Sequence, residues 1–183
     1  MKQKSPFPVL STRRLTLRKL TDGDLPELFE MRADPEMHLF TDTVPDVTTK
    51  DTKNYIEKMN DGVKADLWFI WGIEHTLLHR LIGTISIWNF DEKKQKAELG
   101  FGLTPAFQGR GYMSEALKAV VDYGFKTLKL SIIEAYTDEG NKRSIKLLNN
   151  AGFNYQNTID EAGLKKEKVF KMQVFSLKNP ETY

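Results

Sequence analysis

Short segments in which hydrophobic and polar residues alternate recur along the chain, and this period of two predicts β-strands. The segment 14–20 places Leu15 and Leu17 between polar neighbours, which is the pattern of a strand with one buried face. The segments 67–74 and 81–88 are short apolar runs rich in isoleucine and tryptophan, and the polar link between them favours an antiparallel pair. Six strands are predicted, at residues 14–20, 67–74, 81–88, 97–103, 132–136 and 169–177.

Four further segments carry the signals of amphipathic helices. Thr21 or Asp22 suits the N-cap of the first helix, which is expected to reach Met31. Thr48 suits the cap of the second helix, which is expected to end at the Asn-Asp-Gly turn signal at 60–62.

The two later helices are predicted at 113–128 and 141–151. An apolar stripe runs along the first of them and is formed by Leu117, Val120, Val121 and Phe125. Gly152 suits the left-handed end of the second, and Phe153 can fold back onto its last turn.

The order of these elements predicts a mixed α/β fold in one domain. After residue 97 the elements alternate strand, helix, strand, helix, which implies a right-handed crossover and a partly parallel sheet. No repeat, low-complexity tract or long linker divides the sequence, so residues 1–183 are expected to form a single domain.

Composition and charge argue against several classes of function. The chain has 27 Lys and Arg residues against 25 Asp and Glu residues, a net charge of +2, which lacks the basic excess of a nucleic-acid-binding protein. It has no cysteine, which rules out a thiolate nucleophile or a thiolate metal site. There is no signal-peptide pattern and no apolar run of roughly 18 to 20 residues. A cytoplasmic protein without a nucleic-acid or membrane partner is therefore expected.

The segment 108–113, Gln-Gly-Arg-Gly-Tyr-Met, lies between a predicted strand and a predicted helix and indicates an anion site. Glycine lets the backbone approach a ligand closely, and unpaired N–H groups at a helix start bind phosphate or pyrophosphate. A tight turn in which the glycines serve only geometry explains the same pattern. No Walker lysine follows, and Ser114 stands where a dinucleotide-binding loop has its third glycine, so neither nucleotide loop is indicated.

Several motifs in one order resemble those of the GNAT acetyltransferase superfamily. They are Gln108-x-x-Gly111, Asn141-Lys-Arg-Ser144 and Ala-Gly-Phe at 151–153, preceded by Arg-Leu-Thr-Leu-Arg at 14–18, Ile-Gly-Thr at 82–84 and Ala-Glu-Leu-Gly at 97–100. The last three are similar to the branch that includes the ribosomal-protein N-terminal acetyltransferases. The resemblance implies a twisted, mostly antiparallel mixed sheet with one splayed parallel strand pair, flanked by helices.

The resemblance also implies a site for acetyl-CoA. Backbone N–H groups of the loop are expected to bind its pyrophosphate, and the matching residues are Gln108, Gly109, Arg110, Gly111, Tyr112 and Met113. Met113 replaces the usual small residue, and binding is expected to survive because that position acts mainly through its backbone. The strand before the loop is expected to bulge and splay, so that pantetheine pairs with Phe101, Gly102 and Leu103. Gly100 and Gly102 suit a bulge or close approach independently, and simple packing is the alternative.

Direct acetyl transfer needs a free amine, a polarised thioester carbonyl and a proton donor for the departing thiolate. A backbone N–H near Phe101 or Leu103 is expected to polarise the carbonyl. Ser144 and Asn141 resemble the family residues that stand near the coenzyme sulfur and hold pantetheine, and Asn141 by type also suits a plain helix N-cap. Glu98 is the candidate base, with a structural hydrogen-bond or ion-pair role as the alternative.

The sequence thus predicts an N-acetyltransferase that moves acetyl from acetyl-CoA to a primary amine in a ternary complex, without a metal. The acceptor is a protein N-terminal α-amine or a small amine, and a non-catalytic acyl-CoA-binding module is the alternative. A monomer or a homodimer is expected. His75 and His79 have no third metal ligand signalled nearby, and Trp68, Trp71 and Trp88 are expected in the sheet core.

Overall fold

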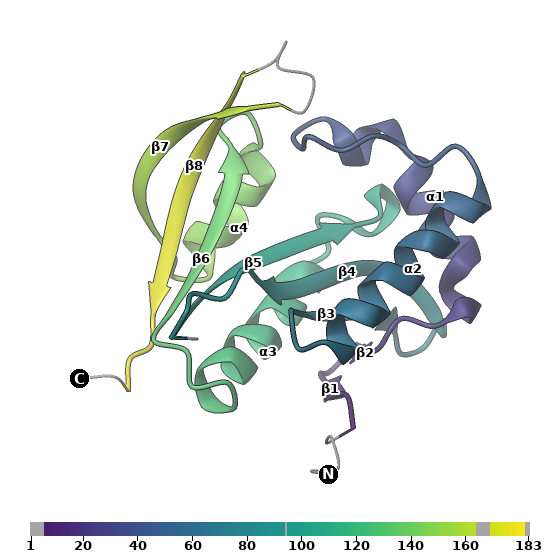
Figure 1. Cartoon of the computed structure of the whole chain (residues 1–183), viewed down its shortest axis with the longest axis horizontal. Coiled ribbons are helices and arrows are strands. Elements are labelled where there is room, and N and C mark those ends of the chain that lie inside the picture. Colours follow the sequence, from purple (N-terminus) through teal and green to yellow (C-terminus); the bar gives the residue numbers. More distant parts are fainter. Residues whose placement is uncertain (1–5, 94, 164–168, 182–183) are drawn as a thin grey trace.

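The computed structural model describes residues 6–93, 95–163 and 169–181, and its centre is one eight-stranded sheet (Figure 1). The strands lie in the order β1-β2-β3-β4-β5-β6-β8-β7. They are β1 (Leu10–Ser11), β2 (Leu15–Arg18), β3 (Phe69–His75), β4 (Arg80–Trp88), β5 (Lys96–Leu103), β6 (Ile132–Asp138), β7 (Asn154–Ala162) and β8 (Val169–Lys178). Within the described chain, neighbours are antiparallel except β5 and β6, which are parallel. The predicted mixed sheet with one parallel pair is confirmed.

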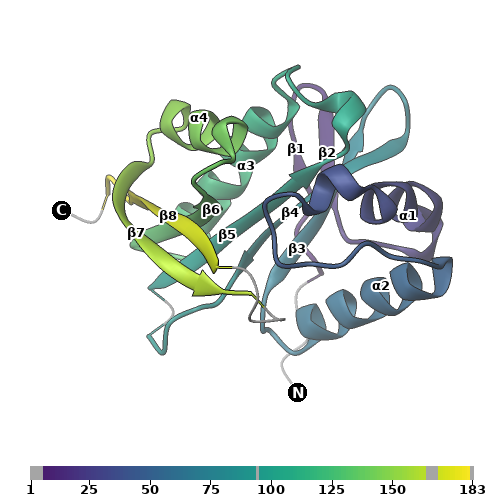
Figure 2. The same cartoon turned by 90° about the horizontal axis from the view of Figure 1, so that it is seen from above.

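Helices lie on both faces of this sheet, with α1 and α2 on one side and α3 and α4 on the other (Figure 2). They are α1 (Leu25–Ala33), α2 (Thr49–Lys64), α3 (Tyr112–Lys126) and α4 (Lys142–Asn150). Successive side chains of a strand point to opposite faces, so Ile70 packs in the smaller core beside α1 and α2 and Trp71 in the larger core beside α3. The stripe predicted for α3 is confirmed, because Leu117, Val120, Val121 and Phe125 are all buried.

The strands β5 and β6 separate after only three residue pairs. Lys96 pairs with Ile132, and the last pair is Glu98 with Glu134. Beyond that pair β5 remains bonded to β4 and β6 to β8, so the two strands form the splayed pair that the resemblance implies. The expected bulge in β5 is wrong on the β4 side, where the register continues without a shift through six residue pairs. The gap between β5 and β6 therefore forms because the hydrogen-bond ladder that joins these two strands ends early.

The first two helices begin close to their predicted caps. The Asp24 carboxylate accepts a hydrogen bond from the N–H of Thr21 at 2.7 Å, and the Asp51 carboxylate accepts one from the N–H of Thr48 at 2.8 Å. Thr21 precedes a 3-10 turn at Asp22–Asp24, so α1 itself starts later than predicted and continues past Met31.

The predicted end of α2 is wrong, because the helix continues through the Asn-Asp-Gly signal to Lys64. Gly62 is buried inside the helix, and a Cβ atom placed on it would lie 1.9 Å from Cζ2 of Trp68. The Trp68 indole N–H donates to the carbonyl of Met59 at 3.0 Å, which fixes the ring against the helix. Glycine at this position makes room for a tryptophan and does not mark a turn.

Two strands and one tryptophan also differ from expectation. The short β1 and the long β7 were not predicted, and every residue of β7 is exposed, so this strand has no buried alternation to reveal it. Trp71 is fully buried, Trp68 packs on α2 from a loop, and Trp88 is 42% exposed, so the expected core position of Trp88 is wrong.

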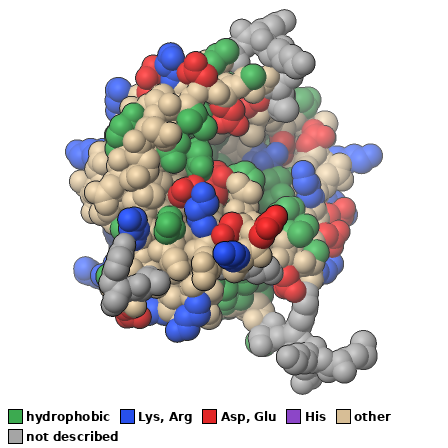
Figure 3. Space-filling model, turned by 60° about the vertical axis from the view of Figure 1, so that its left-hand side comes forward, with side chains coloured by type: hydrophobic (Ala, Val, Ile, Leu, Met, Phe, Trp, Pro, Cys, Tyr) green, Lys and Arg blue, Asp and Glu red, His purple; other side chains and the backbone are tan. Residues whose placement is uncertain are grey.

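The surface agrees with the small net charge of the sequence. Figure 3 shows acidic and basic side chains interspersed on one face of the molecule, without a broad field of one sign. In the part of the chain that the structure describes, no helix is both long enough and apolar enough to cross a membrane.

The replacement Gly62→Ala is expected to lower the free energy of unfolding by about 1 to 3 kcal/mol, because the added methyl group overlaps the Trp68 ring. At an unobstructed helix position the same change would stabilise by about 1 kcal/mol. Urea unfolding measures the difference. Lys53→Ala, at an exposed position of α2, is the control and should stay within about 0.5 kcal/mol of wild type. Wild-type stability of Gly62→Ala would contradict this packing.

Candidate functional site

The loop between β5 and α3 presents a row of backbone N–H groups without partners. Within the described residues, the six N–H groups of residues 109–114 donate to no protein acceptor. Gly109 and Gly111 have φ angles of 74° and 77°, in the left-handed region that favours glycine. The first bond into the helix is made only by the N–H of Glu115, to the carbonyl of Gly111 at 3.2 Å. A row of such donors at the positive end of a helix dipole has the chemistry that suits an anion.

Side chains around this row anchor it to the fold. Met113 is buried in the larger core, so the departure from the family pattern adds packing under the loop. The hydroxyl of Tyr112 lies 3.1 Å from Nε2 of His75. His79 is largely exposed, and among the described residues no three His, Cys, Asp or Glu side chains are grouped to hold a metal ion.

Gln108 uses its polar groups within the protein. Its backbone N–H donates to the carbonyl of Pro105 at 3.1 Å, and its Nε2 donates to the carbonyl of Leu103 at 2.8 Å. Its Oε1 accepts from Nη1 of Arg143 at 2.6 Å. Gln108 therefore lies beside the row of free donors and ties the loop to the end of β5 and to α4.

The gap beside β5 exposes the backbone of alternate residues. The N–H of Thr104 donates to the carbonyl of Ile82 on the β4 side at 2.9 Å. Because alternate residues of an antiparallel strand bond to the same neighbour, Gly102 also directs its backbone to β4, whereas Phe101 and Leu103 direct theirs toward the gap. The Leu103 carbonyl is already used, as described above, so Phe101 offers the backbone best placed to pair with a ligand.

Asn141 and Ser144 lie at the open end of the gap, after the C-terminal end of β6. The Oδ1 atom of Asn141 accepts a hydrogen bond from the N–H of Ser144 at 3.1 Å, so Asn141 is the N-cap of α4. The half-buried Ser144 hydroxyl has no hydrogen-bond partner among the residues that the structure describes. It is free to bond to a ligand in the gap.

Glu98 lies at the closed end of the gap, in the last pair that joins β5 to β6. Burial raises the pKa of the Glu98 carboxyl, the hydrogen bond from Asn89 at 3.3 Å lowers it, and the nearby charges of Glu161 and Glu134 raise it further. The net direction of the shift is upward. A carboxyl group with a raised pKa is suited to accept and release a proton near neutral pH.

A pocket of about 230 Å³ opens on the face of the sheet that carries α1 and α2. Gly100 and Gly102 form part of its floor, where a Cβ atom would come within 2.9 Å of Oγ of Ser86 or within 3.2 Å of Cε of Met37. A side chain at either position would therefore intrude on the pocket. Its other walls include Met31, Arg32, Tyr55, Ile70 and Thr84. We call this space the β5 pocket.

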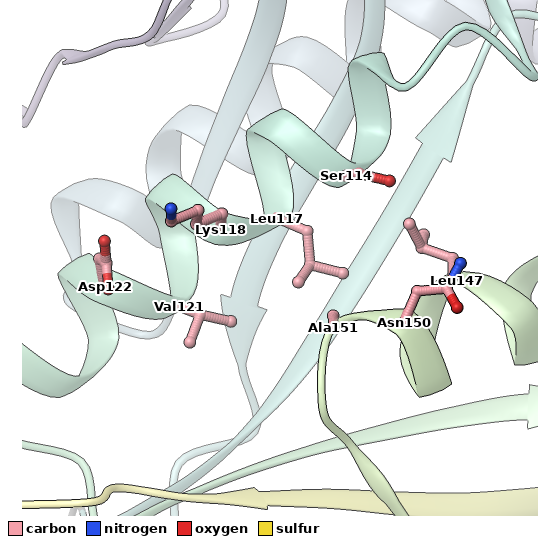
Figure 4. Close-up of a pocket in the computed structure, with 8 residues that line it drawn as sticks. All are labelled: Ser114, Leu117, Lys118, Val121, Asp122, Leu147, Asn150 and Ala151. Atoms are coloured by element: carbon pink, nitrogen blue, oxygen red, sulfur yellow. The ribbon is translucent and has the colours of Figure 1, made fainter.

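A second hollow of about 330 Å³ lies between α3 and α4 (Figure 4). Leu117 and Val121 of α3 point across it toward Ala151, and Ser114 lies near the start of α3 on the same side as Leu147. Four apolar and four polar residues line this hollow, and one of the polar residues, Ser114, is also the last residue of the N–H row at 109–114. A ligand bound at that row can extend into the hollow.

Sequence reasoning missed several residues of this region. Tyr136 donates to Glu134 at 3.0 Å, and burial together with this carboxylate raises the pKa of its phenol to about 12. Arg14 contacts the start of α3, and Arg32 lines the β5 pocket. These residues come from elements far apart in the sequence, so no local pattern predicts that they meet here, although Arg14 lies in the Arg-Leu-Thr-Leu-Arg motif. The one available signal is the alternation of β6, which places Glu134 and Tyr136 on one face.

The chain is similar to known acetyltransferases along most of its length. The family model described as an acetyltransferase (GNAT) domain matches residues 14–154. The uncharacterized N-acetyltransferase p20 of Bacillus licheniformis is 31% identical over 168 residues, which cover 92% of this chain and 94% of p20.

Two solved structures share the fold. The ribosomal-protein-S5-alanine acetyltransferase of Vibrio fischeri has a TM-score of 0.82 at 20% identity and covers 95% of this chain and 98% of its own. The spermidine N-acetyltransferase of Vibrio cholerae, solved with CoA and spermine, has a TM-score of 0.79 at 19% identity and covers 92% and 97%. Because the family model matches well over half of the sequence and p20 aligns along nearly all of it, this protein belongs to the GNAT family and is an acetyl-CoA-dependent N-acetyltransferase.

Proposed function

We propose that this enzyme acetylates the N-terminal α-amine of a peptide or protein, with the pyrophosphate of acetyl-CoA bound at residues 109–114 and pantetheine in the gap between β5 and β6. The observation that carries the proposal is the row of six N–H groups that have no acceptor among the described residues and that follow the end of β5, the strand that borders that gap. A pyrophosphate supplies the acceptors that these donors lack. The carbonyl of Phe101, which faces the gap, supplies an acceptor for a pantetheine amide N–H.

The proposed reaction divides among three groups along the gap. The amine nitrogen attacks the thioester carbon, Glu98 accepts a proton from the nitrogen directly or through a water, and the carbon–sulfur bond breaks. The backbone N–H of Phe101 stabilises the oxyanion, since its side of β5 has no strand partner there. The Ser144 hydroxyl donates a hydrogen bond to the departing thiolate, which then takes its proton from solvent, and Asn141 holds that turn of α4 in place.

The β5 pocket supports an uncharged first residue in the acceptor. Its walls carry methionine, threonine, serine and aromatic groups, and of the described residues no carboxylate lines it. Its arginine, Arg32, is bound to Asp46 at 2.8 Å and lies over the Tyr55 ring at 3.8 Å. A second ammonium group of a polyamine would find no opposite charge there, and an unpaired buried charge is costly. A small uncharged side chain fits these walls better.

The replacement Glu98→Gln is expected to reduce kcat by about a hundredfold, which is the lower range for loss of a general base. In the wild type, activity should fall as the pH drops through the raised pKa of Glu98, because protonation removes the base. Glu98→Gln should lose this acidic limb, and kcat measured from pH 5 to pH 9 tests both effects. The free energy of unfolding of Glu98→Gln at neutral pH should not fall below that of the wild type. A carboxyl group whose pKa is raised in the folded state destabilises that state when it is ionised.

Glu161→Gln is the matched control for that experiment. It removes an exposed carboxylate whose charge raises the pKa of Glu98 and leaves the proposed base in place. It should keep the wild-type maximal rate and move the acidic limb to slightly lower pH. A pH profile of Glu98→Gln that matches the wild type would assign Glu98 a structural role only.

The replacement Gly111→Ala is expected to weaken acetyl-CoA binding about tenfold, because alanine in the left-handed region costs about 1 to 2 kcal/mol and favours a different loop shape. Gly152→Ala places the same strain, at a φ of 85°, after α4 and away from the N–H row. It should lose similar stability and keep its affinity. Calorimetric titration with acetyl-CoA compares the two variants, and equal affinities would argue against pyrophosphate binding at the loop.

A panel of amines is expected to separate the candidate acceptors. Peptides with N-terminal Ala or Ser should release thiol from acetyl-CoA faster than spermidine does, measured as kcat/KM with a thiol reagent. Faster turnover of spermidine would overturn the proposed acceptor class. Thermal stabilisation by acetyl-CoA without thiol release from any amine would instead indicate the non-catalytic binding module.

A further inference from the structure

We propose that Arg14, outside the pyrophosphate loop in sequence, is a positioning residue that holds this loop in its anion-binding shape. The proposal rests on the proposed binding of acetyl-CoA at residues 109–114. Arg14 directly precedes β2 and reaches the start of α3 with both its backbone N–H and its side chain.

Arg14 makes four separate contacts to the first turn of α3 and the loop before it. Its backbone N–H and its Nε donate to the two carboxylate oxygens of Glu115, at 2.7 and 2.8 Å. Its Nη1 donates to the carbonyl of Arg110 at 3.0 Å. Its guanidinium carbon lies 4.3 Å from the centre of the Tyr112 ring. These contacts join one guanidinium group to the loop at Arg110, to the first helical residue, Tyr112, and to the first-turn carboxylate of Glu115.

The bond to Arg110 fixes the direction of a proposed donor. The carbonyl of Arg110 and the N–H of Gly111 belong to one trans peptide unit, so they point in opposite directions. When Arg14 binds the carbonyl, the N–H of Gly111 must point away from Arg14, and it has no acceptor among the described residues. Since Gly111 has great conformational freedom, this constraint on its peptide plane stabilises one orientation of the donor.

The bond to Glu115 removes an electrostatic obstacle. A carboxylate in the first turn of α3 stabilises the helix alone, but it repels a second anion at the same end. Burial raises the pKa of Glu115, but the hydrogen bonds from Thr12 and Arg14 outweigh it, so the net shift is downward and the group stays ionised at neutral pH. The paired guanidinium balances this charge beside the proposed pyrophosphate site.

Tyr112 is held on two sides. The Arg14 guanidinium lies over its ring, and the His75 ring meets it edge to face with centroids 5.2 Å apart. Tyr112 is the first residue of α3 and contributes one of the free N–H groups. Contacts from the residue before β2 and from the last residue of β3 therefore hold the Tyr112 side chain and with it the helix start.

The core does not depend on the Arg14 side chain. That side chain is 37% exposed, and the buried contacts of this region come from Leu15, Leu17 and the apolar face of α3. Replacing the guanidinium should therefore change the loop more than the fold.

The test uses Arg14→Gln, with Arg13→Gln as the matched control for loss of one positive charge at the neighbouring exposed residue. Arg14→Gln is expected to weaken acetyl-CoA binding and raise its KM about tenfold, the loss typical of charged hydrogen bonds, with the acceptor KM and kcat nearly unchanged. Arg13→Gln should bind acetyl-CoA as the wild type does. Calorimetry and steady-state kinetics provide the values.

A double variant separates the two effects of Arg14. Arg14→Gln with Glu115→Gln removes the repelling carboxylate and should regain part of the lost affinity relative to Arg14→Gln alone. If Arg14→Gln fails to fold, Arg14→Lys serves instead, because it keeps the charge and loses the forked geometry. Equal acetyl-CoA affinity of the Arg14 variant and Arg13→Gln would overturn the inference, whereas a wild type that binds no acetyl-CoA would overturn the proposed function.

Discussion

The early end of the ladder between β5 and β6 is the constraint on which the site depends. Buried backbone groups must find partners, and each strand meets this requirement on one side only, β5 with β4 and β6 with β8. After the pair Glu98–Glu134 the facing edges are left for a ligand. The helix that follows each strand, α3 after β5 and α4 after β6, begins at the open end of this gap. The N–H row and the capped start of α4 therefore lie at the open end of the gap, where we propose that the coenzyme binds.

Alternation along β5 then separates the two sides of the site. Ala97, Leu99 and Leu103 pack into the larger core beneath α3, so that side of the strand is filled by core side chains. Gly100 and Gly102 carry no side chain toward the other face, and this absence leaves the β5 pocket open. The proposed coenzyme loop and the proposed acceptor pocket thus meet at one strand from opposite faces of the sheet. Such an arrangement suits direct acetyl transfer, because acetyl-CoA and the amine can reach the strand from opposite sides without blocking each other.

Local patterns predicted most of the fold and the parts of the site that lie within one segment. The α3 stripe, the cap at Thr48 and the left-handed glycine at 152 follow from short-range rules. The end of α2 could not be predicted because Trp68 packs on Gly62, and β7 could not because all its residues are exposed. Motifs located Gln108 without showing that its polar groups bond internally. The carboxylates of Glu98, Glu134 and Glu161 share one neighbourhood only through sheet topology.

The closeness of Glu98, Glu134 and Glu161 bears on the choice between an α-amine and a lysine-type amine as the acceptor. An amine reaches the site mainly as an ammonium ion, which carboxylates attract, yet it must lose a proton before it can attack. An α-amine has a pKa near about 8 and a lysine-type amine near about 10.4, so deprotonation at neutral pH costs the α-amine less. Burial and its acidic neighbours raise the pKa of Glu98, which makes it a better acceptor for that proton than an exposed glutamate. In the proposed reaction, the same three carboxylates therefore favour both the arrival of an α-ammonium group and its conversion to the free amine.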